Sequence, residues 1–382
     1  MQDFNFIVPQ EIIFGVGSLS RLPELMNKSD SKKVLLVSDR GLESLGVVKQ
    51  VSDIITAGGL EVVEFLDVEA NPSVETVNAA ADTYRSSGAT SIIALGGGSP
   101  MDVAKAVGVI TKFGGSITEY EGAHKVPDKI IPIIAIPTTA GTGSETTPMA
   151  VITDRSRNYK LTVFSYEITP AFALLDPNLI TSLPPSLAAS TGVDALIHAI
   201  ESYLSAWASP FSDAMGEKAM SLIGANLRQF TANRGNIEAA SAMLAGSMFA
   251  GIAFGWARLG NIHAMAHPLG GFFNVPHGVA NAILLPTILE YNALADNGRY
   301  EKIYNYVKLP GKKYKSFVPQ MLVDEIIEMN DALGIPKTLS EVGVTEDKIP
   351  QMAADAMKSG NIPLNPRKST QKDLEMLYRK AL

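Results

Sequence analysis

The sequence of 382 residues contains no cysteine and only five histidines. The absence of thiols excludes disulfides, thiolate zinc sites, cysteine-ligated iron–sulfur clusters and cysteine nucleophiles. A transition metal would therefore have to be bound through imidazole and carboxylate groups. The histidines are not spread evenly, because four of the five lie in the second half of the chain, at His198, His263, His267 and His277.

Charge is also scarce. Charged residues make up 19% of the chain, against about 25% in typical globular proteins. The 32 basic residues are outnumbered by 39 acidic ones, so the formal net charge is −7. This balance argues against nucleic acid as a partner, because neutralising phosphates needs a basic face. The low charge also leaves apolar surface for a second subunit, so we expect a homodimer or larger homo-oligomer.

Signals for export and membrane insertion are weak. The N-terminus carries Asp3 where a signal peptide needs positive charge, and it lacks an apolar segment, so we expect a cytoplasmic protein. Residues 239–257 carry no charged side chain, but 12 of these 19 residues are Ala, Gly or Ser. Small residues gain little from lipid and favour close helix packing, so a buried helix is expected here and no membrane partner.

The first half alternates short β-branched runs with helical stretches. Four of these runs, each followed by turn residues, lie at 34–37, 62–65, 92–95 and 133–136. The rhythm predicts an open, mainly parallel sheet with helices on both faces, an arrangement in which ligands bind at the carboxyl ends of the strands.

The strand pattern stops after Pro177, and Pro184–Pro185 precede a long stretch rich in Ala, Leu and Met. We therefore predict two domains, an α/β domain at residues 1–183 and an all-α domain at residues 184–382. Ser186 is the expected cap of the first helix after the proline pair.

A glycine turn, Gly96–Gly98, follows the run at 92–95. We expect Ser99 to cap the next helix and Asp102 to complete a capping box, with free backbone N–H groups that favour a diphosphate. A purely structural turn is the alternative. A second strand end at 137–145, crowded with hydroxyl groups, strengthens the case for a nucleotide.

Asp39 ends the first of the four runs. A carboxylate in this place can accept both hydroxyls of an adenosine ribose and repel a 2′-phosphate, which favours NAD over NADP. The alternative is an ordinary helix cap. Lys160 is uninformative from composition alone and would be an ordinary surface lysine.

The histidines form pairs with helical spacing. Asp194 and His198 stand at i and i+4, as do His263 and His267, and His277 follows on a turn. Each pair alone could be a helical ion pair or a set of hydrogen-bonded core histidines. Together they indicate a metal site, since burying so many polar groups for packing alone is costly. One aspartate and three histidines suit Fe(II) or Zn(II) with a position left for a substrate oxygen.

Four motifs carry a resemblance that covers essentially the whole chain. They are the turn at 96–102, the loop at 138–145, the segment at 192–198, and the segment from His263 to Gly271 continued by residues 276–282. These residues resemble the iron-containing (group III) alcohol dehydrogenase family, in particular its branch of 1,3-propanediol dehydrogenases and lactaldehyde reductases. The resemblance implies an N-terminal nucleotide-binding domain, a C-terminal metal-binding domain, and an active site in a cleft between them.

The resemblance also implies roles for individual residues. Four positions match the family's metal ligands: Asp194, His198, His263 and His277. His267 matches a histidine that stays off the metal beside the nicotinamide, where it could pass a proton to solvent. Nine positions match the family's cofactor contacts: Asp39, Asn71, Gly97, Gly98, Ser99, Thr138, Thr139, Thr142 and Lys160.

The implied function is a metal-dependent oxidoreductase that interconverts small primary alcohols or diols and aldehydes by hydride transfer. The implied cofactors are NAD(H) and Fe²⁺, with Zn²⁺ possible. One alternative is a metal- and NAD-dependent lyase of the dehydroquinate synthase type. Another is a noncatalytic nucleotide-binding or scaffold protein, which would leave the Asp/His cluster unexplained.

Overall fold

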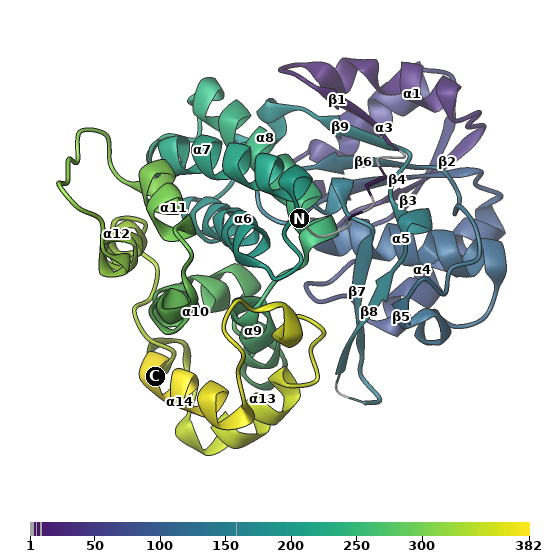
Figure 1. The fold of residues 1–382 in the computed structure, drawn as a ribbon. Coiled ribbons are helices and arrows are strands. Elements are labelled where there is room, and N and C mark those ends of the chain that lie inside the picture. Colours follow the sequence, from purple (N-terminus) through teal and green to yellow (C-terminus); the bar gives the residue numbers. More distant parts are fainter. Residues whose placement is uncertain (1–3, 5, 8–9, 158) are drawn as a thin grey trace. The chain divides into compact units, whose positions relative to one another are not determined.

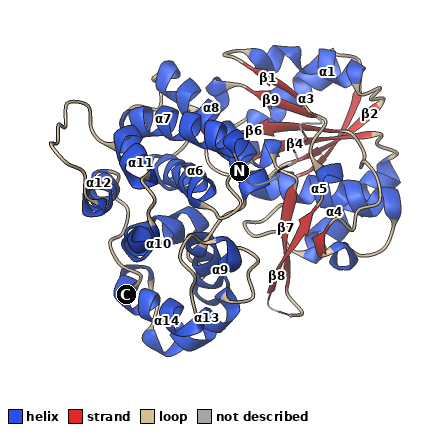
Figure 2. Cartoon of the chain, viewed as in Figure 1, coloured by secondary structure: helices blue, strands red, loops and turns tan. Residues whose placement is uncertain are grey.

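The computed structural model describes the chain except for residues 1–3, 5, 8–9 and 158. It consists of two compact units, one formed by Ile7–Thr181 and the other by Ser182–Leu382 together with the first six residues. Figure 1 shows that, among the described residues, the strands lie in the first unit and the second unit is built from helices, and Figure 2 shows the same division by colour.

A six-stranded parallel sheet forms the centre of the first unit, in the order β1-β9-β6-β4-β2-β3. Its strands are β1 (Glu11–Phe14), β2 (Lys33–Val37), β3 (Glu61–Phe65), β4 (Ser91–Gly96), β6 (Ile133–Pro137) and β9 (Phe172–Leu175). All four runs predicted from the sequence are strands of this sheet, and they are mutually parallel. The predicted α/β class is therefore confirmed.

The central strands are apolar throughout because both faces of the sheet are covered. In β2, Val34 and Leu36 belong to one hydrophobic core, and Leu35 and Val37 belong to the other. The covering helices are α1 (Leu22–Lys28), α2 (Arg40–Ser44), α3 (Val47–Ala57), α4 (Val74–Ser87) and α5 (Gly98–Phe113). Helices α1 and α3 pack on one face and α4 and α5 on the other, so a continuous hydrophobic run is what such a strand needs.

A second, three-stranded sheet lies beside α4 and α5 and was not predicted from the sequence. Strands β7 (Met149–Asp154) and β8 (Tyr159–Phe164) pair antiparallel, and β5 (Gly122–Ala123) pairs parallel with β8. The inward side chains Ile152 and Leu161 join the core beneath α4 and α5. This sheet fixes the end of the hydroxyl-rich loop that precedes β7.

In the second unit, the regular secondary structure of the described residues is entirely helical, with loops between the helices. Its helices are α6 (Pro185–Leu204), α7 (Pro210–Ala232), α8 (Ile237–Ala257), α9 (Asn261–Phe273), α10 (His277–Asn292), α11 (Arg299–Val307), α12 (Pro319–Ala332), α13 (Ile349–Ala356) and α14 (Gln371–Ala381). Helix α6 begins at Pro185 with Pro184 at the cap position, so the prediction that Ser186 caps it is wrong. Proline fits the first helical position because its ring presets φ and no N–H is needed there.

Helix α8 contains the uncharged stretch noted in the sequence. By length and composition it could cross a membrane, yet 67% of its most apolar window is buried within the protein. It packs against α6 and α7, where small residues allow close approach. A Cβ on Gly246, for example, would lie 2.6 Å from Cγ1 of Ile223 on α7. The segment is thus a core helix in this structure.

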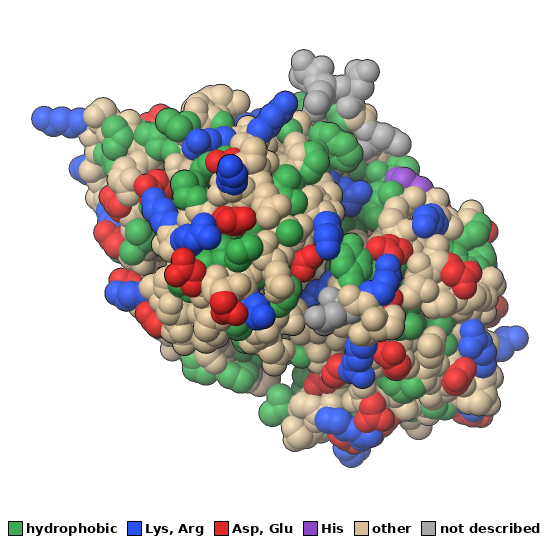
Figure 3. Space-filling view, turned by 90° about the horizontal axis from the view of Figure 1, so that it is seen from below, with side chains coloured by type: hydrophobic (Ala, Val, Ile, Leu, Met, Phe, Trp, Pro, Cys, Tyr) green, Lys and Arg blue, Asp and Glu red, His purple; other side chains and the backbone are tan. Residues whose placement is uncertain are grey.

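Figure 3 shows one face of the molecule with its side chains coloured by type. Lysine and arginine side chains are interspersed with aspartate and glutamate on this face, and no large region of one sign stands out. Elsewhere in the chain, exposed charges form ion pairs, as in the contacts of Lys49 with Asp53 and of Arg40 with Asp67. Such a surface resembles that of an ordinary globular protein.

Candidate active site

Polar side chains follow three adjacent strands of the large sheet at their carboxyl ends. Strands β2, β4 and β6 are neighbours in the sheet, so the turns that follow them lie side by side. Gly96 at the end of β4 pairs in register with Pro137 at the end of β6, and the Thr138 amide donates a hydrogen bond of 3.0 Å to the Gly96 carbonyl. The structure thus brings the glycine turn and the hydroxyl-rich loop together.

The glycine turn leaves little room for side chains at Gly96 and Gly98, and a Cβ at Gly97 would make an ordinary contact. A Cβ on Gly98 would lie 3.1 Å from Cγ2 of Thr142, and one on Gly97 would lie 3.4 Å from Oγ1 of Thr139. Gly96 has a φ of 150°, and its Cβ would lie 2.6 Å from Cγ of Pro100. The backbone is therefore open to close approach, and the first N–H groups of α5 favour an anion. This geometry fits a nucleotide diphosphate.

The predicted capping box at this helix is wrong. Helix α5 begins at Gly98 with Gly97 at the cap position, so Ser99 lies inside the first turn. The Asp102 carboxylate instead accepts hydrogen bonds from the Val151 amide at 3.1 Å and from Oγ of Ser144 at 3.1 Å. Asp102 therefore connects α5 to the hydroxyl-rich loop, and the free helix N-terminus remains available to a ligand.

Lys105, which was not predicted as a site residue, stabilises the hydroxyl-rich loop through hydrogen bonds. Its side chain is completely buried, and Nζ donates to oxygens of Ser144, Thr147 and Met149 at 2.7–3.1 Å. Burial lowers the pKa of Lys105 to about 8, and burial raises the pKa of Asp102 to about 6 and that of Glu145 to about 7. A loop anchored by so many contacts is preorganised for binding.

Asp39 and Asn71 follow β2 and β3 on the same edge. The Asp39 carboxylate accepts the Leu42 amide at 3.0 Å, so it caps α2, and its side chain is only partly buried. Asn71 adopts a left-handed backbone, and its Oδ1 accepts a hydrogen bond of 2.7 Å from Nζ of Lys160 on β8. Burial lowers the pKa of Lys160. Lys160 is thus held next to Asn71, a contact that composition could not reveal.

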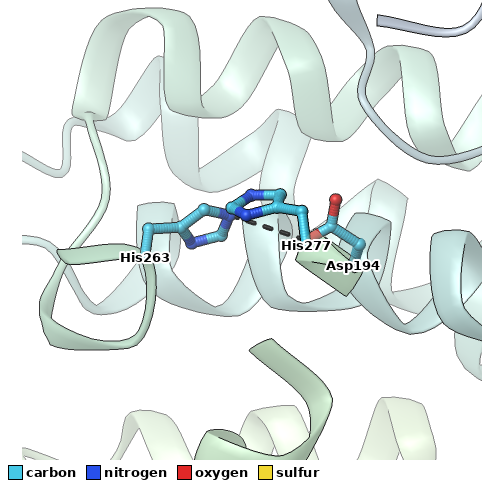
Figure 4. A group of neighbouring side chains, drawn as sticks. All are labelled: Asp194, His263 and His277. Carbon is cyan, nitrogen blue, oxygen red and sulfur yellow. Dashed lines mark ion pairs between the residues drawn. The ribbon is translucent and has the colours of Figure 1, made fainter. Parts of the chain in front are cut away.

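Three potential metal ligands converge in the helical unit. One ligand atom each of Asp194, His263 and His277 lies within 4.8 Å of the other two. Figure 4 shows the three side chains pointing toward one another, and the dashed line marks the 3.6 Å separation of His263 Nε2 and Asp194 Oδ1. They come from α6, α9 and the first residue of α10. Gly278 permits this approach, since a Cβ there would lie 2.5 Å from the Ser190 carbonyl oxygen of α6.

Asn281 on α10 places its side-chain amide at the point on which the three ligand atoms converge. Its amide nitrogen lies 2.7 Å from Oδ1 of Asp194, 3.2 Å from Nε2 of His263 and 3.1 Å from Nε2 of His277. A positively polarised group is thus surrounded by three acceptors. One carboxylate and two imidazoles converging in this way are a donor set that suits Fe²⁺ or Zn²⁺, so these residues fit a metal.

His198 and His267 flank the three converging residues. The His198 ring stacks on that of His263 with centroids 4.6 Å apart, and also on Phe254. The half-buried His267 ring stacks on that of His277 with centroids 5.5 Å apart. His198 is not among the three whose ligand atoms converge, so its role as a fourth ligand stays a prediction.

The buried charges of this cluster depend on one another. Burial alone would raise the pKa of Asp194, but His198, His277 and His263 outweigh it and hold that pKa far below its usual range. Burial likewise works to lower the pKa of His263, but Asp194 and Glu201 raise it to about 9. The site therefore keeps Asp194 ionised and attracts positive charge.

Glu201 is a second residue that the sequence analysis missed. It lies seven residues after Asp194 on α6, and its Oε2 is 2.6 Å from Nδ1 of His263. The spacing of Asp194, His198 and Glu201 at i, i+4 and i+7 places all three on one helix face, and this signal could have identified it.

Comparison with known proteins agrees with this geometry. The family model for iron-containing alcohol dehydrogenase matches residues 9–177, and the model for the C-terminal part of the same family matches residues 188–382. The chain belongs to the iron-containing alcohol dehydrogenase family. The predicted resemblance and the prediction of an oxidoreductase are thereby confirmed, and the dehydroquinate synthase alternative is not supported.

Individual relatives match this chain over nearly its whole length. Lactaldehyde reductase of Escherichia coli K12 is 38% identical, with 99% of each chain covered. The crystal structure of a 1,3-propanediol oxidoreductase has a TM-score of 0.96 at 36% identity, with 100% of both chains covered. Sulfoacetaldehyde reductase from Bifidobacterium kashiwanohense, solved in complex with NAD⁺, has a TM-score of 0.89 at 30% identity, covering 100% of this chain and 99% of that one.

Proposed function

We propose that this family member is a metal-dependent, NAD(H)-linked oxidoreductase that interconverts small primary alcohols or diols and aldehydes by hydride transfer. The observation that carries the proposal is the convergence of Asp194, His263 and His277 on one point, in a chain whose first unit has an open glycine turn at a strand end. The relatives that act on lactaldehyde and 1,3-propanediol support small oxygenated substrates of the same kind.

The proposed binding residues follow from both geometry and family resemblance. The metal ligands are Asp194, His198, His263 and His277, and the metal is Fe²⁺, with Zn²⁺ as the substitute that the Irving–Williams order favours. The NAD(H) contacts are Asp39, Asn71, Gly97, Gly98, Ser99, Thr138, Thr139, Thr142 and Lys160. The neighbour solved with NAD⁺ supports this cofactor.

When bound, the divalent ion supplies Lewis-acid chemistry to the substrate oxygen, and NAD(H) supplies or accepts the hydride. The chain itself provides the surroundings for this chemistry. Asp194 contributes a buried negative charge, and the imidazoles of His263 and His277 would release any proton on the ligating nitrogen and hold the metal in their neutral forms. The apolar residues around Asp194 on α6 exclude water, which strengthens the electrostatic interactions within the site.

His267 is the proposed proton carrier. Its half-buried ring lies parallel to that of His277, so it is next to the converging ligands. An imidazole that is neutral near pH 7 can take a proton from a substrate hydroxyl at one ring nitrogen and release it to solvent.

We further propose that residues 1–183 act as the nucleotide-binding domain and residues 184–382 as the metal-binding domain. The small charged fraction of 19% supports a homodimer or larger homo-oligomer. We also propose a cytoplasmic location, and the net charge of −7 argues against nucleic acid as a partner.

A panel assay tests the proposal. Purified protein with Fe²⁺ or Zn²⁺ and NADH is mixed with short aldehydes and hydroxyaldehydes, and the absorbance of NADH is followed. We expect NADH to be consumed with several of them, and alcohol-dependent NADH formation in the reverse direction. No turnover with any aldehyde or alcohol in the panel would refute the proposal.

A further inference from the structure

Glu201 is a buried carboxylate that contacts the proposed metal ligand His263 at Nδ1, the ring nitrogen on the side away from Asp194. Only 5% of its surface is exposed. Its Oε2 lies 2.6 Å from Nδ1 of His263, while Nε2 of the same ring faces Asp194 and Asn281. The two nitrogens of His263 therefore have separate partners, one on each side of the ring.

The same carboxylate also fixes the backbone that carries His263. Helix α9 begins at Asn261 after Gly260, which has no side chain to cap the helix. Oε1 of Glu201 accepts the Ile262 amide at 2.8 Å, and Oε2 accepts the His263 amide at 3.4 Å. Glu201 thus supplies from α6 the cap that α9 lacks.

Gly260 makes this close approach possible. A Cβ at this position would lie 3.0 Å from Oε1 of Glu201 and 2.9 Å from Oδ1 of Asn365. The contact between Glu201 and the start of α9 is therefore built into the packing of the helical unit, because any larger residue would push the carboxylate away.

We propose that Glu201 is a positioning residue for the metal site: its carboxylate accepts the Nδ1–H of His263, which leaves the Nε2 lone pair directed at the metal. The inference rests on the proposed function, since it concerns the metal site assigned there. A carboxylate behind a ligating imidazole fixes the tautomer and ring orientation and increases the basicity of the ligating nitrogen. Glu201 and Asp194 together also carry the two negative charges that balance a divalent cation in a buried site.

The substitution Glu201→Gln tests the proposal with little change in shape. If the amide oxygen continues to cap Ile262, the amide NH₂ faces Nδ1 and forces the His263 proton onto Nε2, which blocks the lone pair. If the amide is turned round, the carboxylate charge is still lost and Nε2 becomes a weaker donor. In both cases we expect the dissociation constant for Zn²⁺ to rise by about 10- to 100-fold.

Glu325→Gln is the matched control. Glu325 is 1% exposed, belongs to the same unit, accepts the Leu309 amide and pairs with Arg228. It therefore shares burial, charge and an accepted backbone amide with Glu201, but not the contact with His263. Zn²⁺ affinity of each full-length variant is measured by competition with a chromophoric chelator, with circular dichroism as the check on folding. Glu325→Gln is expected to keep the wild-type affinity.

The state of the His263 ring in the wild-type protein loaded with Zn²⁺ provides a second readout that needs no variant. We expect ¹⁵N NMR to show the proton on Nδ1 and zinc on Nε2. Zinc on Nδ1, equal affinities of wild type and Glu201→Gln, or equal weakening by Glu325→Gln would overturn the proposal. A wild-type protein that binds no Zn²⁺ or Fe²⁺ would instead refute the proposed metal site itself.

Discussion

At the scale of single residues, the account depends on a few side chains whose chemistry cannot be replaced by packing. Asp194 is buried next to imidazoles and is the anion among the three converging ligands. Asp39 is the carboxylate at the strand end where a ribose would lie. Each residue makes a separate prediction, because Asp194 is proposed to bind the metal and Asp39 is proposed to determine the choice of cofactor.

Asp194→Asn removes the negative charge from the metal site and retains the shape of the side chain. We expect metal affinity and kcat/KM to fall by more than about 100-fold, since a direct ligand should matter more than the groups that orient it. His277→Ala should behave in the same way. Elemental analysis and steady-state kinetics check this, with Asp213→Asn, which pairs with Arg299 elsewhere in the helical unit, as the control. Stoichiometric metal with a full rate would contradict the ligand assignment.

Asp39→Gly should shift the cofactor preference toward NADPH. The substitution removes a hydrogen bond of about 1.5–3 kcal/mol from the ribose hydroxyls, so kcat/KM for NADH should fall by about 10- to 100-fold. The repulsion of a 2′-phosphate disappears as well. Glycine remains an acceptable helix cap, so α2 should keep its start. The ratio of kcat/KM for the two cofactors is the measurement, and Asp128→Gly on an exposed loop is the control. An unchanged ratio would remove Asp39 from the ribose site.

At the scale of elements, loops are ordered by side chains that reach them from regular structure. The hydroxyl-rich loop is held by Lys105 and Asp102 of α5, and the start of α9 is held by Glu201 of α6. In both cases a buried charged group supplies hydrogen bonds that the local sequence does not. Both contacts join segments distant in the sequence, so periodicity could not predict them.

Glu145 in this loop predicts a pH dependence of stability. Burial raises its pKa from 4.5 to about 7, so the folded state holds the proton more tightly than the unfolded state. Between about pH 4.5 and 7 the unfolded chain ionises first, and stability falls as the pH rises. Glu145→Gln should remove the share of this decline that Glu145 contributes, leaving the smaller share of Asp102, and should stabilise the protein by up to about 3 kcal/mol above pH 7.

Urea unfolding at about pH 5 and pH 8 checks this prediction. The exposed Glu43→Gln in the same unit is the control and should leave the pH dependence unchanged. A wild-type protein that is equally stable at both pH values, or a Glu145→Gln variant with the wild-type decline, would show that Glu145 does not cause a pH dependence of the free energy of unfolding.

Four strands of the large sheet, β2, β3, β4 and β6, could be predicted from their apolar runs, which are continuous where both faces of the sheet are buried, whereas β1 and β9 were not predicted. The hairpin β7–β8 could not, because its strands mix polar residues such as Thr153 and Lys160 with apolar ones and depend on packing against α4 and α5. Helix starts were predicted less well. Proline and glycine at the cap positions displaced the expected serines, Ser99 and Ser186, into the first helical turn.

The candidate site, like the fold, could be predicted only in part. Histidine spacing identified Asp194, His263 and His277, because chemically demanding residues at i and i+4 are rare without a reason. Lys160 gave no signal, since its contact with Asn71 depends on the fold of the small sheet. Glu201 lies seven residues after Asp194, a spacing that places both side chains on one helix face and could have predicted its position near the site.

At the scale of the whole molecule, the two proposed binding sites lie in two different compact units. The α/β unit has the open turn and the partly exposed Asp39, and the helical unit has the buried Asp/His cluster. The low charged fraction of the whole chain and exposed apolar side chains such as Phe14 and Val16 favour assembly with further copies of the chain.

Sedimentation velocity tests the assembly. We expect a mass of at least twice the 40.7 kDa of a single chain, because apolar surface is removed from water on association. The measurement is made over a range of protein concentrations so that weak association is recognised. A single species with the mass of one chain throughout the range would contradict the proposed homo-oligomer.

The transfer of hydrogen from alcohol to cofactor tests the central claim most directly. The metal-loaded protein is incubated with NAD⁺ and propanol deuterated at its carbinol carbon, and the NADH formed is analysed by mass spectrometry. The account predicts one deuterium in the reduced nicotinamide ring, and none when unlabelled propanol is used in deuterated water. Reduced cofactor that takes its hydrogen from solvent, or no reduced cofactor with any alcohol of the panel, would contradict it.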